Sequence, residues 1–401
     1  MTARSGVRRI HVLGGGLWQL PTIRLAKELG YGVLVTDMYP DAPGYAYADD
    51  HEAIDIRDRA QTLDAAKRYA IDGILCDTTD VGVPTAAFVA EQLGLPGIGY
   101  DTALRFTDKA LMREVTRAAG IDNPPFVRVR ASGSLREAES FGFPLVVKPV
   151  DSQSSRGVRR VENRAELEAS VTAALAQSAS GSAIVEGFLD GIEVTVEAMC
   201  YDGHVDALGI SDKEHYADVP QVASRLTYPP AMPPETVARI EDVNTQVIRA
   251  LGLRTGVTHA EYMVAPDGRV TLVEIAARGG GNRLYTHIVP YLSGVPLPRC
   301  YLEHCLGSVA PWPAPRPGRR AAVLEFFSFA AGTVRSVEGV DEASSIPGVA
   351  DLVVEVAPGD VFRGIDNDRA RPGYVVAFGT TRDEALAVAR AAKERVRVVV
   401  A

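Results

Sequence analysis

The chain has 401 residues with 46% apolar and 23% charged side chains, which excludes extended disorder and predicts two to four domains or subdomains. Its net charge of −9 and pI near 5.4 disfavour nonspecific binding to nucleic acid or to an anionic membrane surface. No apolar run approaches the ~20 residues that cross a bilayer. We therefore expect small molecules as ligands, with neither nucleic acid nor membrane as a partner.

The ends and the cysteines give a further expectation about location. Residues 1–9 lead directly into a short apolar stretch that lacks the length of a signal-peptide core, which predicts a cytoplasmic protein. The cysteines lack the spacing of a zinc site, so we expect buried, reduced thiols. They are Cys76, Cys200, Cys300 and Cys305.

The first hundred residues alternate strand and helix patterns, which predicts a parallel sheet flanked by helices. The predicted strands are Arg9–Leu13, Gly32–Asp37 and Gly73–Cys76, and the predicted helices are Pro21–Leu29, Thr62–Tyr69 and Ala86–Leu93. Ligands of such sheets bind at the carboxyl ends of the strands, where Gly15, Gly16 and Asp77 lie. The glycine triplet 14–16 is not Gly-x-Gly-x-x-Gly, the fingerprint that a nicotinamide-dependent oxidoreductase would need.

Lys148 follows the apolar strand 145–147 and precedes the small-residue loop 151–157. A lysine buried there would need an anion, and the loop could close its backbone N–H groups over phosphates. The loop lacks the Gly-Lys-Ser/Thr ending of a Walker loop. Lys148 could equally be a surface lysine whose stem packs on apolar neighbours, and the residues alone leave both interpretations open.

The middle of the chain gives mixed signals. Residues 183–198 predict two paired strands around a Leu-Asp-Gly turn, the second with Glu193, Thr195 and Glu197 on one face. Residues 211–234 are predicted to be irregular and mobile, with Lys213, His215 and Arg225 as candidate contacts. A proline-rich stretch, 311–318, precedes a last unit at about residues 319–401.

Two glutamates, Glu261 and Glu274, lie on the arms of a predicted β-hairpin. The arms are His259–Val264 and Val270–Ile275, and Pro266-Asp267-Gly268 provides the turn. If Ala265 pairs with Val270, the two carboxylates face each other, and such like charges repel unless a cation such as Mg²⁺ lies between them. Alternatively, both side chains point into water, or a slip of one residue separates them onto opposite faces.

Four motifs, in this order, resemble those of ATP-grasp enzymes. They are Asp108-Lys-Ala-Leu-Met-Arg113, the strand and loop 146–158, Val185-Glu-Gly-Phe-Leu-Asp-Gly-Ile-Glu-Val194, and the hairpin ending Glu274-Ile-Ala-Ala-Arg-Gly-Gly-Gly281. The resemblance covers essentially the whole chain. It implies a mixed α/β ATP-grasp fold: an N-terminal doubly wound parallel-sheet domain (1–105), an ATP-binding lid subdomain (106–190), a catalytic antiparallel-sheet domain (191–318) and a C-terminal subdomain (319–401).

The resemblance also implies roles for individual residues. ATP would be bound by Lys109, Lys148, Ser152, Ser154, Ser155, Gly157, Glu186, Phe188, Leu189 and Glu193, and Mg²⁺ by Glu261 and Glu274. Arg278 and Lys148 would be catalytic. The substrate would contact Gly15, Gly16, Asp77, Lys213, Arg278, Gly280, Gly281 and His287, although a histidine with apolar neighbours such as His287 is more often structural. Many family members place a third metal ligand, asparagine, where this chain has Ala276.

The implied reaction is ATP- and Mg²⁺-dependent ligation of a carboxylate to an amine through an acyl phosphate, with release of ADP and phosphate. Ala-Ala-Arg278 resembles L-amino acid ligases of the bacilysin type, and the N-terminal Gly-Gly-Gly-Leu17 and Asp37-Met-Tyr-Pro resemble carboxyaminoimidazole ribonucleotide synthetase. Carboxylation through carboxyphosphate is the alternative. A catalytically dead binding protein would be expected to have lost some of these groups, all of which are present. Related enzymes imply a homodimer.

Overall fold

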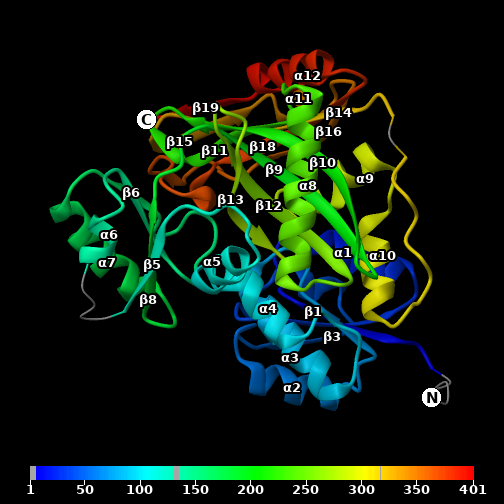
Figure 1. Ribbon diagram of the computed structural model, residues 1–401. Coiled ribbons are helices and arrows are strands. Elements are labelled where there is room, and N and C mark those ends of the chain that lie inside the picture. Colours follow the sequence, from blue (N-terminus) through cyan, green and yellow to red (C-terminus); the bar gives the residue numbers. More distant parts are fainter. Residues whose placement is uncertain (1–5, 131–134, 317) are drawn as a thin grey trace.

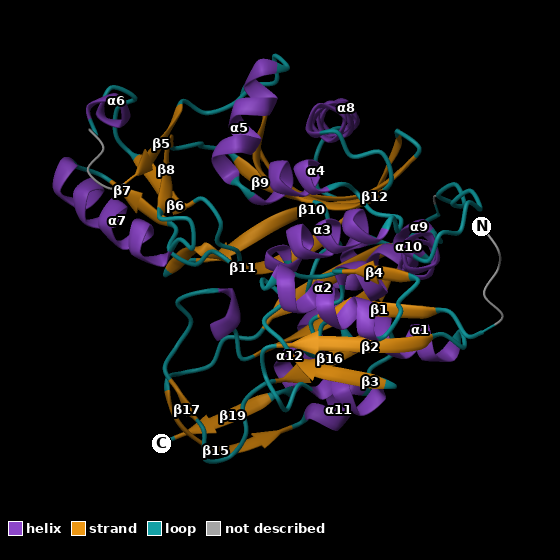
Figure 2. Ribbon diagram, turned by 90° about the horizontal axis from the view of Figure 1, so that it is seen from below, coloured by secondary structure: helices purple, strands orange, loops and turns teal. Residues whose placement is uncertain are grey.

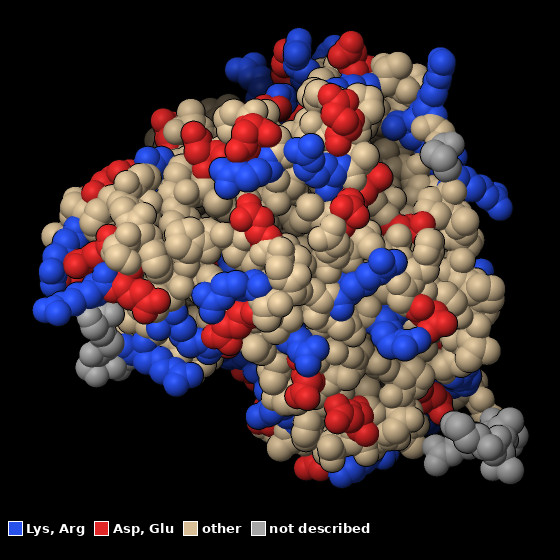
Figure 3. All heavy atoms as spheres, viewed as in Figure 1, with Lys and Arg blue, Asp and Glu red and all other residues tan. Residues whose placement is uncertain are grey.

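The structure, a computed structural model, describes residues 6–130, 135–316 and 318–401. Residues 1–5 of the predicted leading segment and residue 317 of the proline-rich stretch lie outside the described residues. Strands of the described residues form four sheets, and helices pack against the three larger ones (Figures 1 and 2). Acidic and basic side chains are interspersed over the face shown in Figure 3.

The N-terminal unit is the predicted parallel sheet, with strand order β3-β2-β1-β4. Its strands are β1 (Arg9–Leu13), β2 (Gly32–Asp37), β3 (Asp50–Ala53) and β4 (Gly73–Leu75), and its helices are α1 (Leu20–Glu28), α2 (Arg59–Arg68) and α3 (Val83–Leu93), with 3-10 turns at Pro43–Tyr47 and Asp80–Gly82. The sequence pattern missed β3, because this edge strand is polar and only half-buried. Parallel pairing brings the carboxyl ends of β1, β2 and β4 to one edge, as predicted.

Helices α4 (Tyr100–Thr107) and α5 (Lys109–Ala118) lead into a small antiparallel sheet, β5-β8-β6-β7, which projects at the left of Figure 1. We call this unit the lid; it comprises β5 (Phe126–Arg130), α6 (Arg136–Glu139), β6 (Leu145–Pro149), β7 (Arg159–Val161), α7 (Arg164–Gln177) and β8 (Ser182–Gly187). The Asp108 carboxylate caps α5 by accepting hydrogen bonds from the Ala110 and Leu111 N–H groups at 2.9 Å. This cap fixes Lys109 in the first turn of α5.

An eight-stranded sheet forms the body of the molecule, with order β13-β12-β9-β10-β11-β14-β18-β16. Its strands are β9 (Ile192–Tyr201), β10 (His204–Tyr216), β11 (Val219–Tyr228), β12 (Gly256–Val264), β13 (Val270–Ala276), β14 (Ala321–Phe326), β16 (Val349–Val354) and β18 (Gly373–Gly379). Along β9, Val194 and Val196 pack in the same apolar cluster as Ile240 and Val247 of helix α8 (Pro234–Leu251). The opposite face of β9 carries Glu193, Thr195 and Glu197, the predicted alternation.

The remaining elements complete the C-terminal part. They are a π-helical turn (Leu284–Ile288), α9 (Val289–Ser293), α10 (Leu297–Cys305), α11 (Val340–Ser344), a 3-10 turn (Asp368–Ala370), α12 (Arg382–Arg395) and the small sheet of β15 (Gly332–Glu338), β17 (Val361–Phe362) and β19 (Arg397–Val400). Because β14, β16 and β18 extend the eight-stranded sheet, hydrogen bonds continue across the boundary expected at residue 318.

Two predictions about the middle of the chain are wrong. Residues 211–234, expected to be irregular, contain all of β11 and the end of β10, which pair antiparallel. Their polar side chains hid the strand pattern because they pair across the ladder, as Arg225 does with Glu214 at 2.6 Å. The segments 182–187 and 192–201 do not pair with each other either: β8 lies in the lid sheet and β9 in the eight-stranded sheet.

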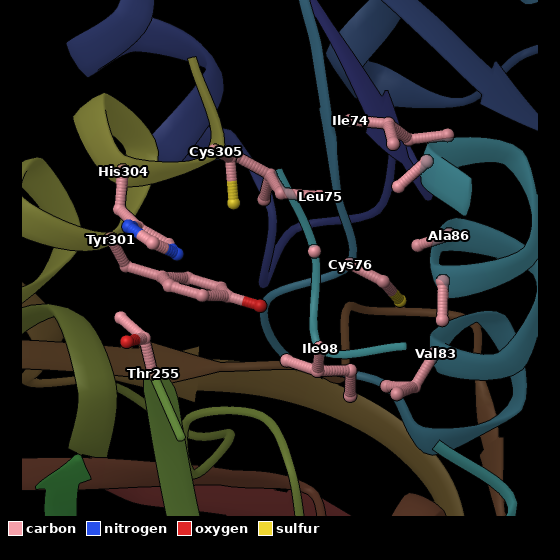
Figure 4. Close-up of a pocket in the computed structure, with 13 residues that line it drawn as sticks. Ile74, Leu75, Cys76, Val83, Ala86, Ile98, Thr255, Tyr301, His304 and Cys305 are labelled. Atoms are coloured by element: carbon pink, nitrogen blue, oxygen red, sulfur yellow. The ribbon is translucent and has the colours of Figure 1, made fainter. Parts of the chain in front are cut away.

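A cavity of about 20 Å³ lies between α3, β4 and α10 (Figure 4). Cys76 and Cys305 are among its lining residues, both buried as free thiols. Its volume suits about one water molecule, so it is not the site of a substrate. Within the described ranges, no helix has the length and apolar character needed to cross a membrane.

Candidate active site

Glu261 and Glu274 are direct cross-strand partners, which confirms that the two carboxylates oppose each other. The register assumed at the turn is wrong, because the Ala265 N–H donates to the Arg269 carbonyl at 2.9 Å and Val264 pairs with Val270. Continued regularly, that register would place Val273 opposite Glu261. A β-bulge at Val273 adds one residue and restores Glu274 to the position facing Glu261.

Arg113 of α5 satisfies the bulged backbone. Its Nη2 donates to the Val273 carbonyl oxygen at 2.8 Å, and its Nε donates to Glu186 Oε1 at 2.6 Å. The Arg113 side chain is only 2% exposed, so both bonds lie in a low-dielectric interior. One buried guanidinium therefore connects the lid to the hairpin directly beside Glu274.

Each hairpin carboxylate already has a cation beside it. Lys109 Nζ lies 2.7 Å from Glu274 Oε1, and Lys213 Nζ lies 2.7 Å from Glu261 Oε1 and 2.6 Å from Glu193 Oε1. Burial opposes ionisation of Glu261, but Lys213 and then His259 hold its pKa well below the usual value. Ammonium groups on both carboxylates show that this site stabilises positive charge, which fits a hard divalent ion.

The protein would supply two ligands to such an ion. Among the described residues, no group of three or more His, Cys, Asp or Glu side chains is arranged to hold a metal. Ala276 faces His259 across the strands, and His259 Nδ1 is bound by the buried Glu197 carboxylate. Burial works against protonation of His259, but Glu197 outweighs it and raises the pKa of His259 to about 9. His259 and Glu197 are site residues that the sequence motifs did not identify.

Glu186 holds a cation rather than facing a ligand with its carboxylate. Its Oε2 lies 2.8 Å from Lys148 Nζ and its Oε1 contacts Arg113, and the residue is only 3% exposed. Burial opposes the shift, but Arg113 and then Lys148 lower the pKa of Glu186 to about 2. Lys148 is therefore an inward lysine with a carboxylate partner, and of Glu186 only the backbone remains for the predicted nucleotide contact.

Phe188 and Leu189, the next two residues expected to bind ATP, are more exposed than Glu186. The Phe188 N–H donates to the Pro144 carbonyl at 3.3 Å, and the exposed Phe188 ring lies 4.3 Å from the guanidinium of Arg160. Leu189 is partly buried. Glu193, which the resemblance implies binds ATP, contacts His215 Nε2 at 3.0 Å in addition to Lys213. It thus belongs to the same charge network as Glu261, since Lys213 contacts both carboxylates.

The Glu186 arrangement predicts a stability effect. Glu186→Gln leaves two buried cations without their common carboxylate, and breaking such a pair costs ~3–5 kcal/mol. We expect that loss in the free energy of unfolding measured with urea at pH 7. Glu162→Gln, which removes the exposed partner of Arg160, is the control and should cost no more than ~1 kcal/mol. Equal effects of the two changes would contradict the buried bridge.

The loop Ser152–Gly157, which we call the phosphate loop, is held from two sides. Ser155 Oγ donates to Asp368 Oδ2 at 3.1 Å, and Gln153 Oε1 accepts from the Asp80 N–H at 2.8 Å. Ser152 Oγ donates within the loop to the Arg156 carbonyl at 2.9 Å. Ser154, Ser155 and Gly157 all have positive φ, 61°, 57° and 75°, as in a tight phosphate-binding turn.

Arg278 is held in a bidentate pair with Asp80. Nε and Nη2 donate to Asp80 Oδ1 and Oδ2 at 2.8 and 3.0 Å, and the two side chains are 14% and 16% exposed. Asp80 comes from the N-terminal unit, 198 positions away. The pair therefore brings the carboxyl edge of the parallel sheet to the end of β13, with the guanidinium fixed in orientation.

The glycines after Arg278 have different roles. A Cβ on Gly279 would lie 2.3 Å from the Tyr285 ring, and one on Gly280 would lie 2.7 Å from Leu284 and 3.0 Å from Glu197 Oε1. These two positions require glycine for close packing. A Cβ on Gly281 would meet nothing within 4 Å, so of the two of these glycines expected to contact the substrate, Gly281 borders open space.

Two of the N-terminal substrate candidates are used internally. The Gly15 N–H donates to Asp37 Oδ2 at 2.8 Å and so is not available to an anion. Asp77 is 0% exposed and accepts hydrogen bonds from Thr22 and Thr78. Gly16 remains partly exposed. Of this edge, Asp80 reaches the site instead, through its pair with Arg278, a role that the sequence motifs did not assign to it.

The buried Asp77 carboxyl predicts a pH-dependent stability difference. Burial raises the pKa of Asp77 from 3.8 to about 6, so its contribution to stability is fully present below pH 3.8 and is lost as pH rises through 6. Asp77→Asn should therefore gain up to ~3 kcal/mol relative to wild type between pH 4 and pH 7. Urea unfolding at both pH values measures it; an unchanged difference between the two proteins would refute the assignment.

His287 lies in the π-helical turn, half-buried, with Nδ1 2.8 Å from Thr286 Oγ1. Burial and then the charge of Arg283 lower the pKa of His287, which favours the neutral ring. Arg283 itself bonds Asp351 Oδ2 at 2.6 Å, so this turn is fixed against the C-terminal part. The structure does not bring His287 into contact with Arg278 or the glutamates among its described hydrogen bonds.

Two protein-family domains and several known proteins match this chain. The ATP-grasp domain matches residues 141–286, and the L-amino acid ligase C-terminal domain 2 matches residues 325–401. An uncharacterised protein, y4rH of Sinorhizobium fredii, is 29% identical over 318 residues, 78% of this chain and 65% of that protein, so the chain spans about two thirds of its length. Formate-dependent phosphoribosylglycinamide formyltransferase of Rhodococcus jostii is 27% identical over 98% of this chain and 96% of that enzyme.

Solved structures share the fold along the whole chain. The L-amino acid ligase of Bacillus licheniformis superimposes with a TM-score of 0.85 at 23% identity, covering 100% of both chains. The N5-carboxyaminoimidazole ribonucleotide synthetase of Thermotoga maritima gives a TM-score of 0.75 at 20% identity, over 98% of this chain and 100% of that one. Both resemblances expected from the sequence motifs are confirmed at the level of the fold.

Proposed function

We propose that this chain joins a small carboxylate, in the first instance an amino acid, to an amine. It carries an ATP-grasp domain and belongs to the ATP-dependent ligases, which use ATP with Mg²⁺. The observation that carries the proposal is the opposed pair Glu261 and Glu274. Lys109 contacts Glu274 directly, Arg278 follows the end of β13, and Lys148 is connected to the hairpin through Glu186 and Arg113. Two carboxylates with several cations near them are the groups that phosphoryl transfer needs, because its catalysis is mainly positioning and charge neutralisation.

The residues divide the work as follows. Lys109 and Lys148 would bind the ATP phosphates under the phosphate loop, and Glu261 and Glu274 would hold Mg²⁺, which neutralises charge on the phosphate oxygens. A substrate carboxylate oxygen bonds to the γ-phosphorus as the bond to ADP breaks. Arg278, held by Asp80, would stabilise the phosphoryl oxygens during this step and the acyl phosphate after it.

In the second step, the amine reacts with the acyl phosphate in the same site to form the amide. The amine nitrogen bonds to the acyl carbon, the C–O bond to phosphate breaks, and the nitrogen loses a proton. The open backbone at Gly281 would border the developing oxyanion, and Arg278 would hold the departing phosphate. The C-terminal match to an L-amino acid ligase domain favours an amino acid as the carboxylate substrate.

A second candidate is phosphorylation of a one-carbon acid. The relatives that align over nearly the full chain, such as the Rhodococcus jostii enzyme, are formate-dependent transferases, so formate is a second substrate to consider. Bicarbonate, the substrate expected of the carboxylation alternative, is a third. All of these use a carboxylate and ATP, and they differ only in the acid that fits the cleft.

The experiment is ADP and phosphate release across a panel of amino acids, formate and bicarbonate, each with hydroxylamine as a trap. An amino acid hydroxamate formed with stoichiometric ADP supports amino acid ligation, and formohydroxamate supports the second candidate. Absence of any hydroxamate from every acid that stimulates ATP consumption would contradict an acyl phosphate. Sedimentation velocity of the same preparation tests the homodimer expected from the resemblance.

A further inference from the structure

Three arginines from three separate parts of the chain lie near the phosphate loop. Arg156 lies in the loop, Arg369 lies in the 3-10 turn Asp368–Ala370, and Arg57 precedes α2. The hydrogen bond from Ser155 to Asp368 at 3.1 Å sets Arg156 beside Arg369, since each arginine adjoins one bonded residue. All three side chains are exposed.

Arg57 belongs to the N-terminal unit, and contacts of that unit with the phosphate loop position it near the loop. Gln153 of the loop accepts the Asp80 N–H at 2.8 Å, and the neighbouring Gly82 packs on Ile56, whose Cδ1 would lie 3.2 Å from a Cβ at that glycine. The pKa of Arg156 is lowered by burial, then by Arg369 and Arg57, which agrees with the mutual approach of the three charges.

Two of these charges have no acidic partner. Arg57 pairs with Asp55 at 2.6 Å, whereas neither Arg156 nor Arg369 forms an ion pair with any residue that the structure describes. Arg156 Nε donates to the Gln153 carbonyl oxygen at 3.2 Å, a neutral acceptor. Like charges held together repel each other, and an anion between them removes that repulsion, the reverse of the argument for the two hairpin glutamates.

We propose that Arg156 and Arg369 recognise an anionic group, carboxylate or phosphate, on the amine substrate, and that they set the enzyme's preference for such amines. The inference rests on the proposed ligase function. The ATP phosphates already have Lys109 and Lys148, neither of which belongs to the C-terminal turn that carries Arg369. Guanidinium groups bind carboxylate and phosphate through two parallel hydrogen bonds, so a pair of them suits either group.

The test separates amine recognition from the first half-reaction. Arg369→Gln and Arg156→Gln should lower kcat/KM for an anionic amine about 10- to 100-fold, the range for losing a hydrogen-bonded charge. In the Arg369→Gln variant, whose residue lies outside the phosphate loop, hydroxamate formation with hydroxylamine, which has no anionic group, should stay within about 3-fold of wild type, as should KM for ATP. Arg164→Gln, an exposed lid arginine on α7 paired with Glu168, is the matched control and should change neither.

The acceptors are the best amino acid of the panel, its carboxamide and O-phosphoethanolamine. Loss confined to the free amino acid identifies a carboxylate, loss confined to O-phosphoethanolamine identifies a phosphate, and Arg369→Lys should restore part of either. The proposal is overturned if both glutamine variants keep wild-type kcat/KM for the anionic amine, if Arg369→Gln raises KM for ATP instead, or if no anionic amine reacts or competes with hydroxylamine in the wild type. Failure of wild-type hydroxamate formation would count against the ligase proposal itself.

Discussion

Replacing Glu274 by glutamine is expected to lower kcat for ATP consumption by at least ~10²–10³-fold, the effect of removing one preorganised electrostatic group from a catalytic site. The substitution keeps the shape of the side chain but removes one of the two carboxylate charges that would hold Mg²⁺. The Glu274 side chain is 34% exposed and that of Lys109 only 9%, so the variant leaves a buried ammonium without its carboxylate. The fold should persist, because Lys109 Nζ still donates to the Ser152 carbonyl oxygen at 2.5 Å.

The matched control for this variant is Glu214→Gln. Glu214 follows Lys213 on β10 and, by the alternation of a strand, lies on the opposite face of the same sheet, where it pairs with Arg225. The Glu214→Gln substitution removes the same charge from the same sheet, and this variant should keep near wild-type kcat. A Glu274→Gln enzyme with full activity, or one no more impaired than Glu214→Gln, would show that the hairpin does not hold the metal.

Arg278→Lys should lower kcat for hydroxamate formation by ~10²–10³-fold while KM for ATP changes little, because an arginine on a transferring phosphoryl group acts mainly in the transition state. Lysine keeps the charge but cannot form the two parallel bonds to Asp80 while facing the phosphoryl oxygens. Arg225→Lys is the control: it breaks a similar bidentate pair with Glu214 on the far face of the sheet and should leave kcat unchanged.

A double-mutant cycle shows whether Asp80 acts through Arg278. If Asp80 only orients the guanidinium, Asp80→Asn should cost kcat in the wild type and add little in the Arg278→Lys background, since groups that act as a unit are not additive. Fully additive losses would instead mean that Asp80 contacts the reactants independently.

The sequence motifs predicted which glutamates face each other, but not the contacts that hold them in place. The opposition of Glu261 and Glu274 is confirmed, but it depends on a bulge at Val273 that has no signature in the local sequence. What stabilises the bulge is Arg113, 160 positions earlier in the chain. Local propensity cannot report such a pairing, because a carbonyl left out of a ladder can be satisfied from anywhere in the fold.

The same limit explains the residues that were missed or misjudged. Asp77 and Asp80 follow the same strand, and only tertiary packing decides that Asp77 is buried against Thr22 while Asp80 meets Arg278. Lys213 was placed in an irregular segment because β10 carries charged residues on the face that binds Glu193. These charged residues replace the apolar alternation that identifies a strand, and such departures from local sequence patterns are most common at functional sites.

The fate of the substrate's oxygen atoms tests the central claim most directly. An acid labelled with ¹⁸O in its carboxylate is incubated with ATP, Mg²⁺ and an amine, and the released phosphate is analysed by mass spectrometry. Acyl phosphate chemistry transfers one carboxylate oxygen to phosphate in each turnover and leaves the other in the amide, with ADP as the nucleotide product. Unlabelled phosphate, or release of AMP and pyrophosphate, would contradict the account.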